Sequence, residues 1–166
     1  MICCVTGHRP KGFPFDYDDR SGVAFRDYQK RLESAVECLI QEGYDYFICG
    51  MAQGADLDFA ETVIRFKKRY KRSIAIRLEA AIPCPNQTKY WGNYDRKRYQ
   101  RILKKCDKQT LVSPVYQSAC MQLRNQYMVD RSALVFAIWN GTPSGGTWNT
   151  IRYAKDRGKP LRFLML

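Results

Sequence analysis

The chain has 166 residues, of which 28 are Lys or Arg and 16 are Asp or Glu, so its formal net charge at pH 7 is +12. Hydrophobic residues make up 45% of the chain and aromatic residues 13%, which excludes an intrinsically disordered protein, because disorder requires few apolar residues beside a high net charge. The length predicts one domain, residues 1–166, with a core large enough to fold without disulfides or metal.

Strand-like and helix-like segments alternate along the chain, with a short turn signal between neighbours. Apolar runs predict six strands, at residues 2–6, 46–49, 73–82, 110–112, 133–139 and 161–166. Helical spacing of apolar residues predicts five helices between them, at about residues 23–42, 54–70, 88–105, 118–129 and 147–157. This alternation is typical of βαβ units. We therefore predict an α/β fold: a Rossmann-like, doubly wound, mainly parallel sheet with helices on both faces.

The seven cysteines do not form a recognisable framework. No pair has the C-x-x-C spacing of a zinc or redox site, so we expect neither a metal nor disulfides. Free cysteines in apolar runs are usually buried, and only Cys84, beside two prolines, is expected to be exposed. The chain also lacks an apolar run of about eighteen residues and a signal-peptide pattern at Met1, so we expect a cytoplasmic protein with no membrane partner.

In open parallel sheets, ligands bind beyond the carboxyl ends of the strands, and the first loop there is Thr6-Gly7-His8-Arg9-Pro10. A glycine directly after a strand lets backbone N–H groups approach a ligand, and Arg9 offers a planar fork for phosphate or carboxylate. His8 is the only histidine, which favours a hydrogen-bonding or acid/base role over metal binding. The alternative is a histidine that only closes the turn.

The second loop contains Gly50, Gly54 and Asp56 between a strand and a helix. Such a loop presents N–H groups and the positive end of a helix dipole to an anion. Its G-x-x-x-G-x-D spacing is neither a P-loop nor a G-x-G-x-x-G motif. The alternative interpretation of Asp56, as a cap of the helix, is favoured by its position in the first turn.

The third and fourth loops precede and follow the most hydrophobic strand. Arg124 shares a helix face with Met128, whereas Asn125 and Asp130 are expected to point elsewhere. The alternative interpretation of Arg124 is an ordinary surface charge. In the fourth loop, Gly145, Gly146 and Thr147 open a helix and form the best phosphate site of the chain. The alternative there is a flexible connection with Thr147 as the helix cap.

Taken together, the four loops resemble the SLOG superfamily, which includes the Smf/DprA DNA-processing proteins and the Lonely-guy phosphoribohydrolases, and most closely its small YpsA-like branch. The motifs that carry the resemblance run from Thr6 to Thr147 and include residues 50–56, Pro83 with Gln87 and Trp91, and residues 124–130. The resemblance implies a nucleotide-type ligand and no cofactor. It implies these ligand-binding residues: Gly7, His8, Arg9, Gly50, Gly54, Asp56, Arg124, Asn125, Gly145, Gly146 and Thr147.

The resemblance is incomplete where the Lonely-guy enzymes cleave the N-glycosidic bond. Their R-K-x-x-M stretch has Asn125 in place of Lys, and Thr150 stands where their catalytic Glu belongs. Hydrolysis needs a carboxylate to orient water and stabilise the transition state, so Asp56 or Asp130 would have to act, with His8 and Arg124 as the other catalytic candidates. We therefore expect a nucleotide-binding sensor or regulator, with a nucleoside-monophosphate phosphoribohydrolase as the alternative.

A third hypothesis is single-stranded DNA binding, as in the DNA-processing relatives. Basic runs at residues 65–72 and 96–108, with Tyr70, Tyr90, Tyr94 and Tyr99 nearby, supply the cations and aromatic rings that such binding uses. The alternative is two solvated helix faces whose tyrosines pack inward. The resemblance also raises a homodimer as a partner, since related proteins often form dimers.

Overall fold

The computed structural model describes all 166 residues and contains six strands, five α-helices and one short 3-10 helix. The strands are β1 (Ile2–Gly7), β2 (Tyr46–Cys49), β3 (Arg77–Ile82), β4 (Lys108–Leu111), β5 (Leu134–Trp139) and β6 (Leu161–Met165). The helices are η1 (Pro10–Gly12), α1 (Val23–Gln41), α2 (Ala55–Arg69), α3 (Asn93–Leu103), α4 (Cys120–Arg131) and α5 (Gly145–Asp156). The predicted alternation of strands and helices is confirmed.

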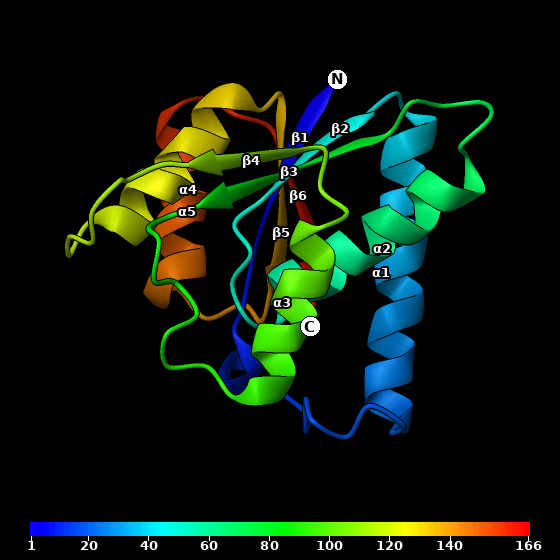
Figure 1. The fold of residues 1–166 in the computed structure, drawn as a ribbon. Helices are drawn as coiled ribbons and strands as arrows, with labels where there is room; N and C mark the ends of the chain where they lie inside the picture. Colours follow the sequence, from blue (N-terminus) through cyan, green and yellow to red (C-terminus); the bar gives the residue numbers. More distant parts are fainter.

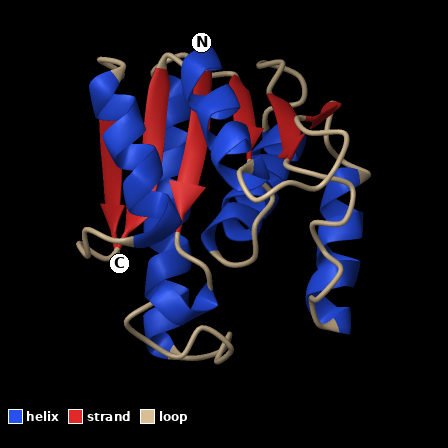
Figure 2. Ribbon diagram, turned by 90° about the vertical axis from the view of Figure 1, so that its left-hand side faces the viewer, coloured by secondary structure: helices blue, strands red, loops and turns tan.

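The six strands form one sheet in the order β4-β3-β2-β1-β5-β6, and every neighbouring pair is parallel, with all strands running in one direction (Figure 2). From β1 the chain builds outward through β2, β3 and β4, and then crosses back to add β5 and β6 on the other side of β1. This is the doubly wound arrangement that the sequence predicts. Its switch point lies between β1 and β5, where such sheets open a crevice for a ligand.

Helices cover both faces of the sheet: α1, α2 and α3 lie on one face and α4 and α5 on the other (Figure 1). A core cluster of 29 buried residues lies mainly under the first group, and a cluster of seven lies under the second. Cys3, Cys4 and Val5 of β1 are fully buried, as expected of a central strand packed on both faces. No helix combines the length and apolar character needed to cross a bilayer.

Several local expectations differ from the structure; β4, for example, spans Lys108–Leu111 rather than residues 110–112. β3 begins at Arg77 rather than at residue 73, because its pairing with β2 starts opposite Tyr46. α3 begins at Asn93 rather than at residue 88, because residues 86–91 fold into turns closed by backbone hydrogen bonds from Lys89 and Trp91. Cys84 was expected to be exposed but is buried, with 1% of its surface exposed, because the loop after β3 folds its thiol against Cys120 of α4.

A buried ionic network joins α2, α3 and the loop before α1. The guanidinium of Arg98 donates to Asp58 at 2.6 Å and to Glu61 at 2.8 Å, and Tyr17 and Tyr28 donate their hydroxyls to Asp58. Arg98 and Asp58 are 2% and 1% exposed. A buried charge requires partners of this kind. Arg98 therefore joins α3 to α2 and is not part of the exposed basic surface that the sequence predicts for residues 96–108.

Candidate functional site

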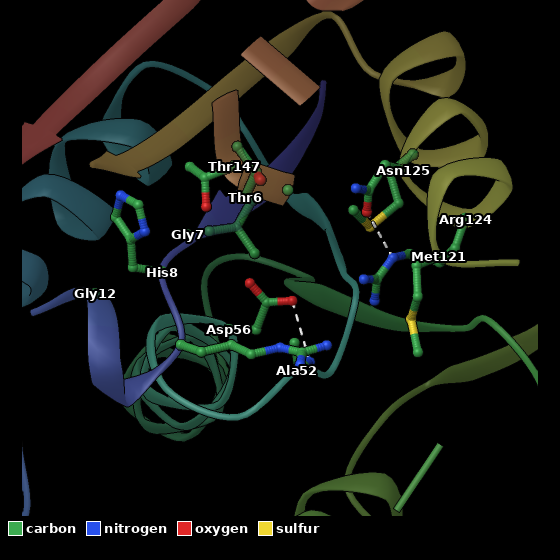
Figure 3. A pocket seen from close by; sticks show the side chains of 14 residues that line it. Thr6, Gly7, His8, Gly12, Ala52, Asp56, Met121, Arg124, Asn125 and Thr147 are labelled. Atoms are coloured by element: carbon green, nitrogen blue, oxygen red, sulfur yellow. Dashed lines mark hydrogen bonds between the residues drawn. The ribbon is translucent and has the colours of Figure 1, made fainter. Parts of the chain in front are cut away.

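A polar cavity lies beyond the carboxyl ends of β1, β2 and β5, at the switch point of the sheet. This strand-end cavity has a volume of about 350 Å³. It is lined by residues from the loop after β1, the loop before α2, and helices α4 and α5 (Figure 3). The polar and charged side chains that line it are Thr6, His8, Arg9, Asp56, Arg124, Asn125 and Thr147. Of the eleven predicted ligand-binding residues, Gly50, Gly54 and Gly145 do not line it.

Gly54 explains how the first two loops meet. Its φ is +88°, and a Cβ there would lie 2.5 Å from the carbonyl oxygen of His8 and 3.0 Å from Cα of Arg9. The next residue, Ala55, donates its N–H to that same carbonyl at 3.0 Å. Only glycine permits both this backbone conformation and this approach. Gly54 therefore shapes the site through the backbone.

Arg124 is a buried cation in the wall of the cavity. It is 6% exposed, its Nη1 donates to the carbonyl oxygen of Gly50, and its Nε donates to Oδ1 of Asn125 at 2.8 Å. The expectation that Asn125 points elsewhere is wrong, because both side chains line the same cavity (Figure 3). Burial lowers the pKa of Arg124, but a guanidinium keeps its charge at neutral pH. The surface-charge interpretation of Arg124 is excluded.

Gln87 holds the same loop from the other side. Its Nε2 donates to the carbonyl oxygens of Gly50 and Met51, both at 3.1 Å. Met51 has a φ of +58° and is fully buried, a conformation that a long side chain rarely adopts. The two side-chain donors, Gln87 and Arg124, keep this strained turn in place beside the cavity.

Asp56 is the only acidic side chain that lines the strand-end cavity. It is 4% exposed, and its Oδ2 accepts the N–H of Ala52 at 3.2 Å. Burial raises its pKa to about 6, against the opposing charges of Arg124 and Arg9. The helix-cap interpretation of Asp56 is wrong, because Gly54 occupies the cap position of α2. Asp56 is instead a carboxyl group with a pKa raised to about 6, and it lines the cavity.

His8 contributes the second titratable group. Its Nε2 is buried and has no hydrogen-bond partner, and burial lowers its pKa. A buried polar nitrogen without a partner is uncommon in a folded protein. Beside it, Asn140 donates to the carbonyl oxygen of Gly12 at 2.9 Å and so ties the loop after β5 to the loop after β1. His8 therefore lines the cavity, with one ring nitrogen, Nε2, buried and unpartnered and with Asn140 in contact with the imidazole.

The first turn of α5 supplies backbone N–H groups. The helix begins at Gly145, and no side chain caps it, since Ser144 at the cap position makes no such bond. Thr147 therefore lies inside the helix and is not the cap considered above. A Cβ on Gly145 or Gly146 would meet nothing within 4 Å, so this helix end is open. Uncapped N–H groups at a helix start attract anions.

The structure separates Asp130 and Thr150 from the site. Both oxygens of Asp130 accept from the Tyr153 hydroxyl, and its Oδ1 lies 3.7 Å from the guanidinium of Arg157. The hydroxyl of Thr150 donates to the carbonyl oxygen of Gly146 at 2.9 Å. Six further residues line the cavity but are not among the predicted ligand-binding residues: Val5, Thr6, Gly12, Ala52, Met121 and Met128. The helical spacing of residues 121, 124, 125 and 128 is the one signal that could have indicated Met121.

Replacing Asp56 by Asn is expected to stabilise the protein at pH 8 by about 3 kcal/mol. The folded pKa of about 6 lies above the usual 3.8, so the contribution of Asp56 to stability is present below pH 4 and is lost as the pH rises through 6. One pKa unit corresponds to about 1.4 kcal/mol. Urea unfolding at pH 4 and pH 8 measures the effect, which should vanish at pH 4.

The control for this prediction is Asp156→Asn, which neutralises an exposed acid at the end of α5. It should change the free energy of unfolding little at either pH. An effect of Asp56→Asn that is equal at pH 4 and pH 8 would show that burial of the charge does not destabilise the folded state.

The two basic runs form a surface apart from the strand-end cavity. A groove of about 490 Å³ runs along α3, and the side chains that line it are Thr88, Arg96, Lys97, Gln100, Arg101, Lys104 and Lys105. Of its five cations, only Arg101 has an ion-pair partner, Glu61 at 3.4 Å. Tyr99 packs inward, whereas Tyr90 and Tyr94 are 89% and 67% exposed. The alternative interpretation, in which the tyrosines pack inward, is therefore wrong for these two.

The parallel sheet, its order and the cavity at its switch point define the chain as a Rossmann-like α/β protein with a polar site at the strand ends. Residues 3–164 match the YpsA model, described as the YspA SLOG family. The chain belongs to this family, which confirms the resemblance based on the four loops.

Similar proteins come from bacteria. A UPF0398 protein of Halalkalibacterium halodurans is 25% identical over 158 residues, 94% of this chain and 81% of its own length. The SPbeta prophage-derived protein YoqJ of Bacillus subtilis is 31% identical over 138 residues, 75% of this chain and 78% of its own length. Among solved structures, DNA processing protein A of Helicobacter pylori, described for its single-stranded DNA binding mode, is similar with a TM-score of 0.63 and 16% identity. The match covers all of this chain but 66% of that one, and it shows the fold.

Proposed function

We propose that the chain binds a phosphorylated nucleoside in the strand-end cavity and acts as a sensor or regulator. The observation that carries this proposal is the pairing of a buried guanidinium, Arg124, with the open first turn of α5 in one cavity. Backbone N–H groups and a planar guanidinium are the two groups that proteins use most for phosphate. Asp56, Asn125 and His8 then offer polar contacts to the ribose or the base.

A Gly146→Asp variant should lose nucleotide binding by more than tenfold while its stability stays the same or rises slightly. The new carboxylate has free space and favours the positive end of the helix dipole by about 0.3–1 kcal/mol, but it repels a phosphate. Calorimetry with the four nucleoside 5′-monophosphates measures the affinity. Gly92→Asp is the matched control, because it places the same acid at the open start of α3, and it should bind like the wild type.

The proposal excludes efficient hydrolysis of the ligand, because the position of the catalytic Glu is held by Thr150, whose hydroxyl is already bonded within α5. Asp56 is the remaining carboxyl group that a phosphoribohydrolase could use. Chromatography of the same calorimetry samples distinguishes the two functions: intact nucleotide supports a sensor, and free base that disappears in Asp56→Asn supports the hydrolase.

Single-stranded DNA binding is the second candidate function, and the α3 groove is the observation that favours it. The five cations of the groove are exposed, and each phosphate they contact steepens the loss of affinity with salt. A single-stranded oligonucleotide added to the panel separates the two sites. Binding that falls steeply between low and high salt and is insensitive to Gly146→Asp belongs to the groove, whereas the reverse pattern belongs to the strand-end cavity.

A further inference from the structure

A second cavity adjoins the strand-end cavity and differs from it in its lining. This aromatic cavity has a volume of about 570 Å³, and Tyr90, Trp91 and Tyr116 line it together with Lys89 and Gln87. It shares Arg9 and Met121 with the strand-end cavity. The two cavities therefore adjoin, with Arg9 and Met121 at their junction.

The exposed rings of the aromatic cavity have no structural role in the core. Tyr90 is 89% exposed and Tyr116 is 73% exposed, although such rings stabilise a fold only when they are buried. Neither hydroxyl makes a hydrogen bond within the protein. The Tyr90 ring makes one cation–π contact, with the ammonium of Lys89 at 5.3 Å from the ring centre. Two large rings that stay in water at the mouth of a cavity are available to stack on a flat ligand.

The inner wall of the aromatic cavity is firmly anchored. Trp91 packs edge-on against the buried Tyr99, with ring centres 5.5 Å apart, and the Tyr99 hydroxyl approaches Oε1 of Gln87 at 3.5 Å. Gln87 in turn donates to Gly50 and Met51, whose loop supports the strand-end cavity. The hydrogen bonds of Gln87 thus tie the wall of the aromatic cavity to the loop that leads to Ala52 in the strand-end cavity, which preorganises the two for a ligand that occupies both.

Arg9 has the position and charge to hold the link between two parts of such a ligand. Its side chain is exposed and makes no hydrogen bond or ion pair within the protein, and it lines both cavities. Lys89 adds a second cation on the aromatic side. A free guanidinium between a phosphate-binding pocket and a stacking pocket matches a phosphodiester that joins two nucleosides.

We propose that the ligand is a dinucleotide whose first nucleotide occupies the strand-end cavity and whose second base stacks in the aromatic cavity. This inference rests on the proposed function for the first nucleotide. Stacking of one base on aromatic side chains strengthens binding by roughly ten- to hundredfold, so a dinucleotide should bind at least tenfold more tightly than the corresponding mononucleotide.

Calorimetry with the four nucleoside 5′-monophosphates and the four 5′-phosphorylated homodinucleotides tests the inference. In the wild type, at least one dinucleotide should bind tenfold or more tightly than its mononucleotide. The double variant Tyr90→Ala/Tyr116→Ala should remove this advantage and leave mononucleotide affinity unchanged. Tyr94→Ala is the control, because it removes another exposed tyrosine ring, in α3, that lines neither cavity, and it should keep the advantage.

The possible outcomes separate this inference from the function on which it rests. Equal affinity for mononucleotides and dinucleotides, or an advantage that survives in the double variant, overturns the second subsite and leaves the nucleotide site intact. Binding of no nucleotide of either length overturns both proposals. A 5′-phosphorylated single-stranded decamer distinguishes a free dinucleotide from the end of a strand: equal affinity identifies the free molecule, further gain identifies the strand end, and either supports the subsite.

Discussion

Replacement of Arg124 by Ala is expected to weaken nucleotide binding by about tenfold to a hundredfold. Hydrogen bonds from a charged donor contribute about 1.5–3 kcal/mol each, and Arg124 is the cation whose guanidinium is buried in the wall of the strand-end cavity. The variant also removes the positive charge that opposes the high pKa of Asp56, so the carboxyl group should protonate at a still higher pH. Calorimetry with nucleoside monophosphates measures the loss of affinity.

Arg131→Ala is the matched control for this prediction. It removes the same charge from the same helix, but Arg131 is exposed and rests on the ring of Tyr127 at 4.0 Å, so binding should not change. The carbonyl of Gly50 keeps a donor, Gln87, when Arg124 is removed, and the variant should therefore fold, as circular dichroism can verify. Wild-type affinity in a folded Arg124→Ala variant would contradict the placement of phosphate beside α4.

Replacement of Gly54 by Ala is expected to destabilise the protein by about 3 kcal/mol or more. Backbone conformations that only glycine adopts readily cost other residues about 1–3 kcal/mol, and Gly54 has a φ of +88°. The added methyl group would also lie 2.5 Å from the carbonyl oxygen of His8, so the two loops must separate. Since domains of this size are stable by about 5–15 kcal/mol, urea unfolding should detect the change easily.

Gly158→Ala separates the two causes of that destabilisation. Gly158 also has a positive φ, +62°, but a Cβ there would meet nothing within 4 Å, so only the backbone cost of about 1–2 kcal/mol applies. Gly54→Ala should therefore be clearly the more destabilising variant. An equal loss of stability in the two would mean that the approach of the two loops contributes nothing.

Individual elements show how far local sequence patterns extend. The bounds of β2 are predicted to the residue, because Tyr46–Cys49 is a short apolar run that ends at a glycine. α3 is predicted five residues too early, because residues 88–92 carry no helical periodicity of their own, and their turns depend on hydrogen bonds within the folded loop. Segments with a strong apolar period are predicted reliably, and segments without one are not.

The candidate site shows the same division. Glycines that directly follow strands identify the loops after β1 and before α2, and the glycines that open a helix, Gly145 and Gly146, identify the loop before α5. The side chains within them were harder to assign: Asn125 was expected to face away from Arg124 and accepts a hydrogen bond from it. Asp56 and Asp130 were equivalent candidates in the sequence, and only Asp56 lines the cavity.

The sequence by itself determined that this chain is a doubly wound α/β protein of the SLOG type, since strand and helix periodicity and the glycines after strands are local properties. The tertiary structure alone decided that Arg124 is buried, that the pKa of Asp56 is raised to about 6, and that an aromatic cavity adjoins the site. Each of these depends on the order β4-β3-β2-β1-β5-β6, which brings together loops far apart in the chain. A side chain is buried only by such contacts, and its burial is what makes its charge unfavourable in free energy.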